Sequence, residues 1–318
     1  MSTTATTSTS PTTVLIHNNN NTNISSLSSP NSRLLQSLHN ERMQRQRIQP
    51  IQKQLSLLLP STITKSKTPN YCLIPYKSWP GNAIGSIVWE GTLALLSYWE
   101  NQQYGTTLTI SSTPLNILEL GSGIGLLSIG YSCIFANQLL NIYITDHKDV
   151  IPLLQENVNE YQAYISKNNP YTLPIPKFTV SSLSWGTTDN TLLTSNSNID
   201  IIITADVIYE PISTKLFIET LDILLPKLSS TSSTTPSLSY CIMAYKERGI
   251  GDYFFQLLHE YQFIMEDLTP KTITNLSILH YTNQEKSNGI TNSNKDNSSS
   301  TTIPWPYTQH RIFKIYRK

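Results

Sequence analysis

The stretch LNILELGSGIGLLSIG, residues 115–130, joins two apolar runs through a glycine-rich turn. The run that ends at Leu120 predicts a buried strand, and the run that starts at Gly125 predicts a helix. Such a strand-turn-helix unit offers backbone N–H groups and a helix N-terminus to a ligand. The sequence therefore predicts a ligand-binding turn, and the residues around it have to indicate the ligand.

Strand and helix patterns alternate along the chain from about residue 71 onward. Runs with a strand pattern are 116–120, 141–146, 177–185, 199–209 and 237–246. Runs with a helix pattern are 125–136, 150–161, 213–228 (with Ser213 as N-cap) and 251–263. Two more strand-like runs, 275–282 and 311–318, have no helix between them and predict an antiparallel edge hairpin. We expect an α/β fold with a doubly wound, mostly parallel seven-stranded sheet.

Polar, low-complexity segments precede and interrupt this pattern. We expect residues 1–66 to form a disordered extension that contains a basic, glutamine-rich segment. That basic segment is either an organelle transit peptide or a short helix beside the folded domain. The folded domain is expected over residues 67–318, with polar surface insertions near 229–237 and 283–307.

Charge and cysteine content argue against several classes of function. The formal net charge of +1 gives no large field to attract nucleic acid. The three cysteines, Cys72, Cys133 and Cys241, lie far apart in the sequence and predict neither a disulfide framework nor a metal site. No apolar run reaches the roughly 18 residues that a membrane-spanning helix needs. We expect no nucleic-acid partner, no membrane partner and no metal.

The glycine turn matches neither of the two common phosphate-binding patterns. Leu126 stands where the dinucleotide pattern G-x-G-x-x-G has its third glycine, and no lysine followed by serine or threonine completes a P-loop. Glu119, two residues ahead of Gly121, would repel a phosphate but can help to hold a cationic amino-acid group. The backbone of Gly121, Ser122 and Gly123 lets an adenosine-bearing ligand approach closely.

Asp146 ends the second predicted strand, where a carboxylate can accept hydrogen bonds from two ribose hydroxyls. Together with Glu119, Gly121 and Gly123, this acid indicates S-adenosylmethionine as the cofactor. The alternative is an ordinary turn between a strand and a helix, with an acidic residue that follows the next strand by chance.

At these motifs the sequence resembles the seven-strand protein-lysine methyltransferases of the methyltransferase-like class, whose members modify chaperones, a AAA ATPase and translation elongation factors. The resemblance covers about residues 71–265 and the last strand. It rests on the motifs IVWEG (87–91), LELGSGIG (118–125), ITDHKD (144–149), LSWG (183–186) and ADVIYE (205–210). Glu90 departs from the family, in which aspartate is more frequent. The resemblance implies a Rossmann-like class I methyltransferase fold that binds S-adenosylmethionine.

These motifs suggest roles for single residues. In the resembled family the tryptophan at Trp89 borders the cofactor from a helix, and the residue at Ala205 contacts it through the backbone. Trp185 ends the third predicted strand, where its indole can lie against the adenine; for both tryptophans the alternative is core packing. Asp206 and Tyr209 form D-x-x-Y, in which the carboxylate can orient a lysine ammonium and the ring can line its stem. The alternative here is a helix-capping aspartate with a packing tyrosine.

We therefore expect an enzyme that transfers a methyl group from S-adenosylmethionine to a lysine of a protein. The resemblance suggests translation elongation factor 1-alpha as a candidate substrate. The alternatives are a non-catalytic module that binds an adenosyl ligand or a partner, and a methyltransferase that acts on small molecules or RNA. The near-neutral charge weighs against RNA, and the intact D-x-x-Y weighs against a non-catalytic module. We expect a monomeric protein in the cytoplasm.

Overall fold

The computed structural model describes most of the chain from residue 51 onward, within one compact unit, Ile48–Lys318. The described residues are 51–58, 71–80, 83–103, 114–168, 174–187, 199–225, 239–274 and 302–317. The strand predicted at 275–282, the insertion at 229–237 and residues 1–50 of the predicted extension lie outside them.

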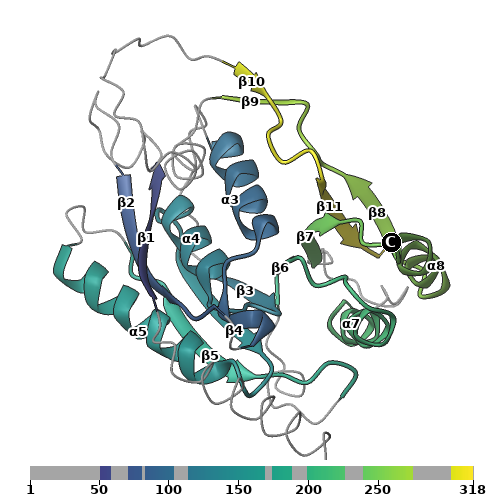
Figure 1. Ribbon diagram of the computed structural model, residues 1–318, viewed down its shortest axis with the longest axis horizontal. Helices are drawn as coiled ribbons and strands as arrows, with labels where there is room; N and C mark the ends of the chain where they lie inside the picture. The colour runs from purple at the N-terminus through teal and green to yellow at the C-terminus, as the bar shows by residue number, and fades with distance from the viewer. Residues whose placement is uncertain are drawn as a thin grey trace, which may run out of the picture. The chain divides into compact units, whose positions relative to one another are not determined.

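A seven-stranded sheet forms the centre of this unit (Figure 1). In spatial order the strands are β5 (Lys177–Ser182), β4 (Leu140–Asp146), β3 (Leu115–Leu120), β6 (Ile201–Ala205), β7 (Tyr240–Lys246), β11 (His310–Tyr316) and β8 (Ile264–Asp267). The first five are parallel, whereas β11 is antiparallel to both of its neighbours. The predicted sheet and its antiparallel C-terminal edge are confirmed, and the antiparallel partners of β11 within the described residues are β7 and β8. The four residues of β8 are too few to show a strand pattern.

Helices cover both faces of the sheet (Figure 1). They are α3 (Glu90–Gln103), α4 (Leu126–Ile134), α5 (Ile151–Asn168), α7 (Pro211–Leu224) and α8 (Gly251–Glu260). Because successive strand residues point to opposite faces, Ile117 packs in a cluster with α3, α4 and α5, whereas Leu118 packs in a cluster with α7 and α8. Within the described residues, none of these helices is long and apolar enough to cross a membrane.

Two strands ahead of the sheet pair antiparallel, β1 (Ile51–Leu58) and β2 (Tyr71–Ser78). Leu55 and Leu57 of β1 are fully buried in the cluster that contains α4. The prediction of disorder up to residue 66 is therefore wrong for 51–58. This part of the basic segment forms a strand and not a helix. The two leucines alternate with polar residues, and the glutamine-rich surroundings conceal this short strand pattern.

A second antiparallel pair consists of β9 (Thr272–Thr274) and β10 (Thr302–Pro304). Trp305 and Tyr307, directly after β10, are buried in the same cluster as Ile273. The predicted surface insertion at 283–307 is therefore wrong for its last residues, because aromatic side chains anchor them in the core.

The strand order places a crevice at the C-terminal end of β3. From β3 the chain moves to β4 and β5 on one side and then returns to β6 and β7 on the other side. Ligands bind to such sheets where this direction reverses. The strand predicted at 199–209 ends early, at Ala205, because Asp206 takes a left-handed φ of 59°. The cap of α7 is Glu210, whose carboxylate accepts from the backbone N–H of Ser213, so Ser213 is not the N-cap.

Candidate active site

One cavity brings together nine of the ten site residues predicted from the sequence. It has a volume of about 210 Å³ and lies at the C-terminal ends of β3, β4 and β6. The nine residues are Trp89, Gly121, Ser122, Gly123, Asp146, Trp185, Ala205, Asp206 and Tyr209. They come from separate segments of the chain, so the fold assembles the site.

The glycine turn has the shape that close packing requires. Gly121 and Gly123 take left-handed φ values of 67° and 55°. A Cβ atom on Gly121 would lie 2.8 Å from Cγ1 of Val207, and one on Gly123 would lie 2.9 Å from the carbonyl oxygen of Gly85. The protein's own packing therefore requires these glycines, apart from any ligand.

Asp146 ends β4 beside the glycine turn and offers lone pairs to a ligand. Its Oδ2 accepts a hydrogen bond of 2.6 Å from the backbone N–H of Gly123, and its Oδ1 accepts one of 2.6 Å from that of His147. Burial raises the pKa of Asp146, and these two backbone donors oppose that rise. Each oxygen keeps capacity for a second hydrogen bond, as two ribose hydroxyls would require.

Glu119 is the predicted site residue that does not line the cavity. Its side chain lies on the same face of β3 as Ile117, and its Oε2 accepts a hydrogen bond of 3.1 Å from the backbone N–H of Ser128 in α4. Burial raises the pKa of Glu119 to about 8. This placement supports a structural role beneath the turn and does not support the predicted contact with a cationic amino-acid group.

The two tryptophans occupy different environments. Trp89 directly precedes α3 instead of lying within a helix, is 39% exposed, and donates a hydrogen bond of 3.0 Å from Nε1 to the carbonyl oxygen of Ile84. Trp185 packs edge-on against Phe217, with ring centroids 5.4 Å apart, and also lines the cavity. Trp185 therefore both packs in the core and lines the cavity.

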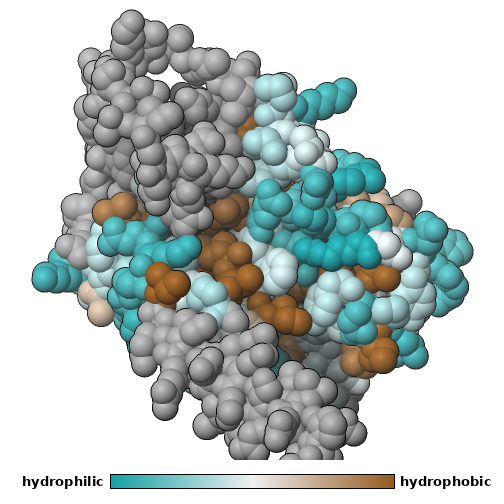
Figure 2. Space-filling view, in the orientation of Figure 1, coloured by the Kyte–Doolittle hydropathy of each residue, from teal (hydrophilic) through white to brown (hydrophobic). Residues whose placement is uncertain are grey.

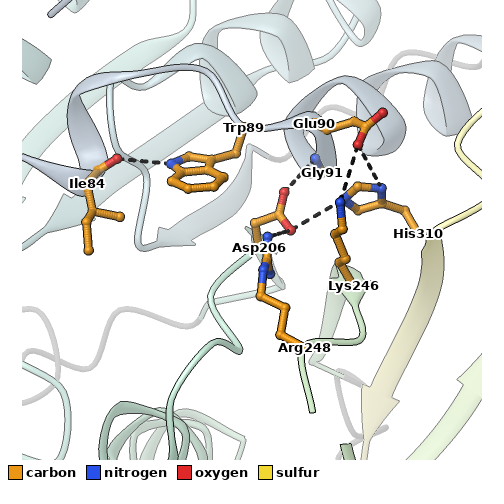
Figure 3. A network of polar contacts seen from close by, with 8 residues as sticks. All are labelled: Ile84, Trp89, Glu90, Gly91, Asp206, Lys246, Arg248 and His310. Carbon is orange, nitrogen blue, oxygen red and sulfur yellow. Dashed lines mark hydrogen bonds and ion pairs between the residues drawn. The ribbon is translucent and has the colours of Figure 1, made fainter. Parts of the chain in front are cut away.

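Asp206 is the centre of a polar network (Figure 3). Its Oδ2 accepts a hydrogen bond of 2.6 Å from the backbone N–H of Gly91, in the first turn of α3. Its Oδ1 accepts one of 2.7 Å from Arg248 Nη2 and lies 3.3 Å from His310 Nε2. The Asp206 side chain is only 2% exposed. The Asp206 carboxylate therefore caps α3, and its oxygens already have partners within the protein.

Basic partners keep Asp206 ionised. Burial acts to raise its pKa, but the hydrogen bonds and charges of His310 and Arg248 outweigh burial and hold the pKa below its ordinary value. Glu90 extends the network, because its carboxylate lies 3.7 Å from Lys246 Nζ and 3.9 Å from His310 Nδ1. The network thus balances acidic and basic groups beside the cavity (Figure 3).

Nothing in the local sequence pattern singles out Arg248 or His310. Arg248 follows the end of β7 by two residues, and the C-terminal edge of a parallel strand is the signal that could have revealed it. His310 begins the antiparallel strand β11 opposite Lys246, so its side chain reaches the same edge. Only the register of β11 places His310 beside Asp206, and the polar insertion that precedes β11 hides this register in the sequence.

The cavity has the chemistry that an adenosyl ligand requires. Besides the lone pairs of Asp146, it holds the buried Oγ of Ser122, which has no hydrogen-bond partner among the described residues. Tyr209 lines the cavity and is 43% exposed, so its ring is accessible to an incoming side chain. The described part of the chain contains no cluster of His, Cys, Asp or Glu that could hold a metal ion.

A family model described as lysine methyltransferase matches residues 74–261 of the chain. A search of curated proteins gives no match. Similar solved structures include the precorrin-6y C5,15-methyltransferase from Geobacter metallireducens GS-15, at 10% identity over 71% of this chain and 86% of that one, with a TM-score of 0.38.

Two further solved structures show comparable similarity. A ribosomal protein L11 methylase from Lactobacillus delbrueckii subsp. bulgaricus has 14% identity, with 71% of this chain and 77% of that one covered and a TM-score of 0.34. A human methyltransferase 10 domain containing protein has 9% identity, with 72% and 83% covered and a TM-score of 0.38.

Proposed function

The chain belongs to the lysine methyltransferase family, and on this premise we propose that it transfers a methyl group from S-adenosylmethionine to the side chain of a lysine in a protein. It is a methyltransferase with a Rossmann-like class I fold. One observation carries the finer proposal: a single cavity joins the glycine turn, Asp146 and the two residues of D-x-x-Y.

The residues of the cavity fit S-adenosylmethionine, which when bound supplies an electrophilic methyl group on a sulfonium. Asp146 would accept hydrogen bonds from the ribose hydroxyls. Trp185 would lie against the adenine, while Trp89 and the backbone of Ala205 would border the ligand. Glu119 has no part in this arrangement, because it lies beneath the turn.

A lysine must be neutral before its Nζ can attack, and the cavity favours the neutral amine. Removal from water lowers the pKa of a lysine. Asp206 would oppose this if its charge were free, but Arg248 already pairs with it at 2.7 Å. The ring of Tyr209 offers a surface for the apolar stem of the lysine. Positioning and desolvation support the reaction, and we assign no general base.

Methylation by the full-length protein tests this function. The protein is incubated with radiolabelled S-adenosylmethionine and a proteome from cells that lack it, and acid hydrolysis of the labelled protein should release methyl-lysine. Elongation factor 1-alpha is the first purified substrate to try, and we propose that the enzyme meets its substrate as a monomer in the cytoplasm. Label in RNA or small molecules alone would contradict the proposal, and cofactor binding without transfer would favour a non-catalytic module.

A further inference from the structure

Exposed apolar side chains gather at the cavity. On the face drawn in Figure 2, hydrophobic residues reach the surface among hydrophilic ones. Among the described residues, the most exposed large hydrophobic side chains are Ile212 at 72% and Ile84 at 65%. Ile84, Trp89 and Tyr209 line the cavity, and Ile212 follows Tyr209 by three residues in the first turn of α7. We call these four side chains the apolar rim.

The apolar rim is fixed before any partner arrives. The indole of Trp89 is tied to the backbone of Ile84 by its hydrogen bond, and the guanidinium of Arg248 lies 5.8 Å from the centre of the Trp89 ring. Ile212 stands on a helix whose N-terminus is capped by Glu210. A preformed surface of aromatic and aliphatic side chains is typical of the energetically dominant part of a protein–protein interface.

The charges around the apolar rim do not suit a polyanion. Among the described residues that line the cavity, Arg248 is the only cation, and Asp206 pairs with it at 2.7 Å. Lys246, on the neighbouring strand end, lies 3.7 Å from Glu90. Binding of RNA depends on cations that are free to neutralise phosphates. The charges that line the cavity therefore favour an apolar partner surface over a nucleic acid.

We propose that the apolar rim docks a protein surface on which the target lysine is flanked by apolar side chains. This inference rests on the proposed function and names the class of substrate. A lysine that enters the cavity brings its neighbours against Ile84, Trp89, Tyr209 and Ile212, and their burial supplies binding free energy. Scattered exposed apolar residues need no explanation, but a cluster around a cavity indicates a binding surface.

Ile212→Ser tests the apolar rim without touching the cavity. Burial of one isoleucine at an interface corresponds to about a tenfold change in affinity. The rate at low concentration of substrate protein should therefore fall about tenfold. The rate at saturating substrate and the affinity for S-adenosylhomocysteine, measured by calorimetry, should each stay within about twofold. Ile84→Ser, at a rim residue that also lines the cavity, should likewise lower the rate at low concentration of substrate protein.

Ile223→Ser is the matched control. Ile223 lies on the same helix, is 37% exposed and stands about 16 Å further along the axis of α7. Its rate at low substrate should equal that of the unmodified protein. Ile175→Ser provides a second control, because Ile175 is 56% exposed and belongs to neither the cavity nor the rim.

Charged replacements separate apolar docking from recognition by charge. Ile212→Glu and Ile212→Lys should both slow methylation at low substrate, whereas recognition by charge would make one of them faster. Peptides with a central lysine flanked by leucine and phenylalanine should be methylated faster than those flanked by glutamate or by arginine.

The outcomes distinguish this inference from the proposed function. If the unmodified protein methylates lysine and Ile212→Ser behaves like Ile223→Ser, the docking surface is refuted and the proposed function stands. If charged flanks are preferred in the peptides, the docking surface is likewise refuted. If the unmodified protein labels RNA and no lysine, both proposals are wrong.

Discussion

The buried carboxyl of Glu119 links the stability of the fold to pH. Burial raises the pKa of Glu119 from 4.5 to about 8. Between these two pH values Glu119 is protonated in the folded chain and deprotonated in the unfolded chain. Folding stability should therefore be highest below pH 4.5 as far as this group is concerned, and should fall as pH rises towards 8. The loss above pH 8 is on the order of 5 kcal/mol.

Glu119→Gln should remove that pH dependence. The glutamine can still accept the hydrogen bond from Ser128 but carries no charge to bury. Urea denaturation should show the variant more stable than the unmodified protein at pH 8.5, with a difference that shrinks towards pH 5. A difference that stays constant over this range would show that Glu119 does not titrate there.

Asp146→Asn should separate ribose recognition from the shape of the turn. The asparagine oxygen can still accept from Gly123, but the charge is lost, and an amide nitrogen replaces the oxygen that accepts from the backbone N–H of His147. A hydrogen bond to a charged group contributes about 1.5–3 kcal/mol, so affinity for S-adenosylhomocysteine should fall roughly tenfold to a hundredfold. Calorimetry with the 2′-deoxy analogue is the control, since that ligand should lose less. Equal losses for both ligands would mean that the hydroxyl is bound elsewhere.

The strand β1 should be essential to the fold despite its polar surroundings. Leu55 and Leu57 are fully buried against the cluster of α4, and burial of each leucine contributes about 2 kcal/mol. A chain that starts at Thr68 should therefore unfold at clearly lower temperature than the full chain. A chain that starts at Ile48 keeps β1 and should match the full chain. Equal melting temperatures for both shortened chains would show that β1 adds no stability.

The elements that the sequence predicts well are those buried on both faces. The strands β3, β4, β6 and β7 are mostly apolar, because helices cover both faces of the sheet. The strands β1, β8, β9 and β10 are short or polar, so their patterns are too weak to recognise. The site follows the same rule, because the residues at the ends of these strands were predictable. The direction of the Glu119 side chain depends on the alternation of faces along β3. The position of His310 depends on the register of β11, which the local sequence does not show.

Asp206 connects three segments of the chain that are far apart in the sequence. This one carboxylate contacts the start of α3, the turn after β7 and the start of β11, through Gly91, Arg248 and His310. These partners are 115, 42 and 104 residues away in the sequence. The network therefore couples the segment that carries Trp89 to the strand β11 beside the cavity.

Asp206→Asn should weaken folding and ligand binding together. The asparagine can accept from Gly91 but leaves the guanidinium of Arg248 without its counter-charge. Loss of one partner of a buried ion pair costs about 3–5 kcal/mol, and the 23% exposure of Arg248 reduces this to about 2 kcal/mol. Thermal unfolding should show the loss, and affinity for S-adenosylhomocysteine should fall because Arg248, which lies 5.8 Å from the centre of the Trp89 ring at the cavity, is no longer anchored by Asp206.

The control is Asp267→Asn, which breaks a pair with the exposed Arg311 and should change stability little. Because the pKa of Asp206 lies below its ordinary value of 3.8, its contribution is present at neutral pH and is lost only as pH falls through the lowered value. The destabilisation by Asp206→Asn should therefore be present at both pH 6 and pH 8, whereas the effect of Glu119→Gln should shrink towards pH 5. If the variant instead keeps normal stability and normal ligand affinity but methylates slowly, Asp206 acts on the lysine directly, as the D-x-x-Y pattern alone suggests.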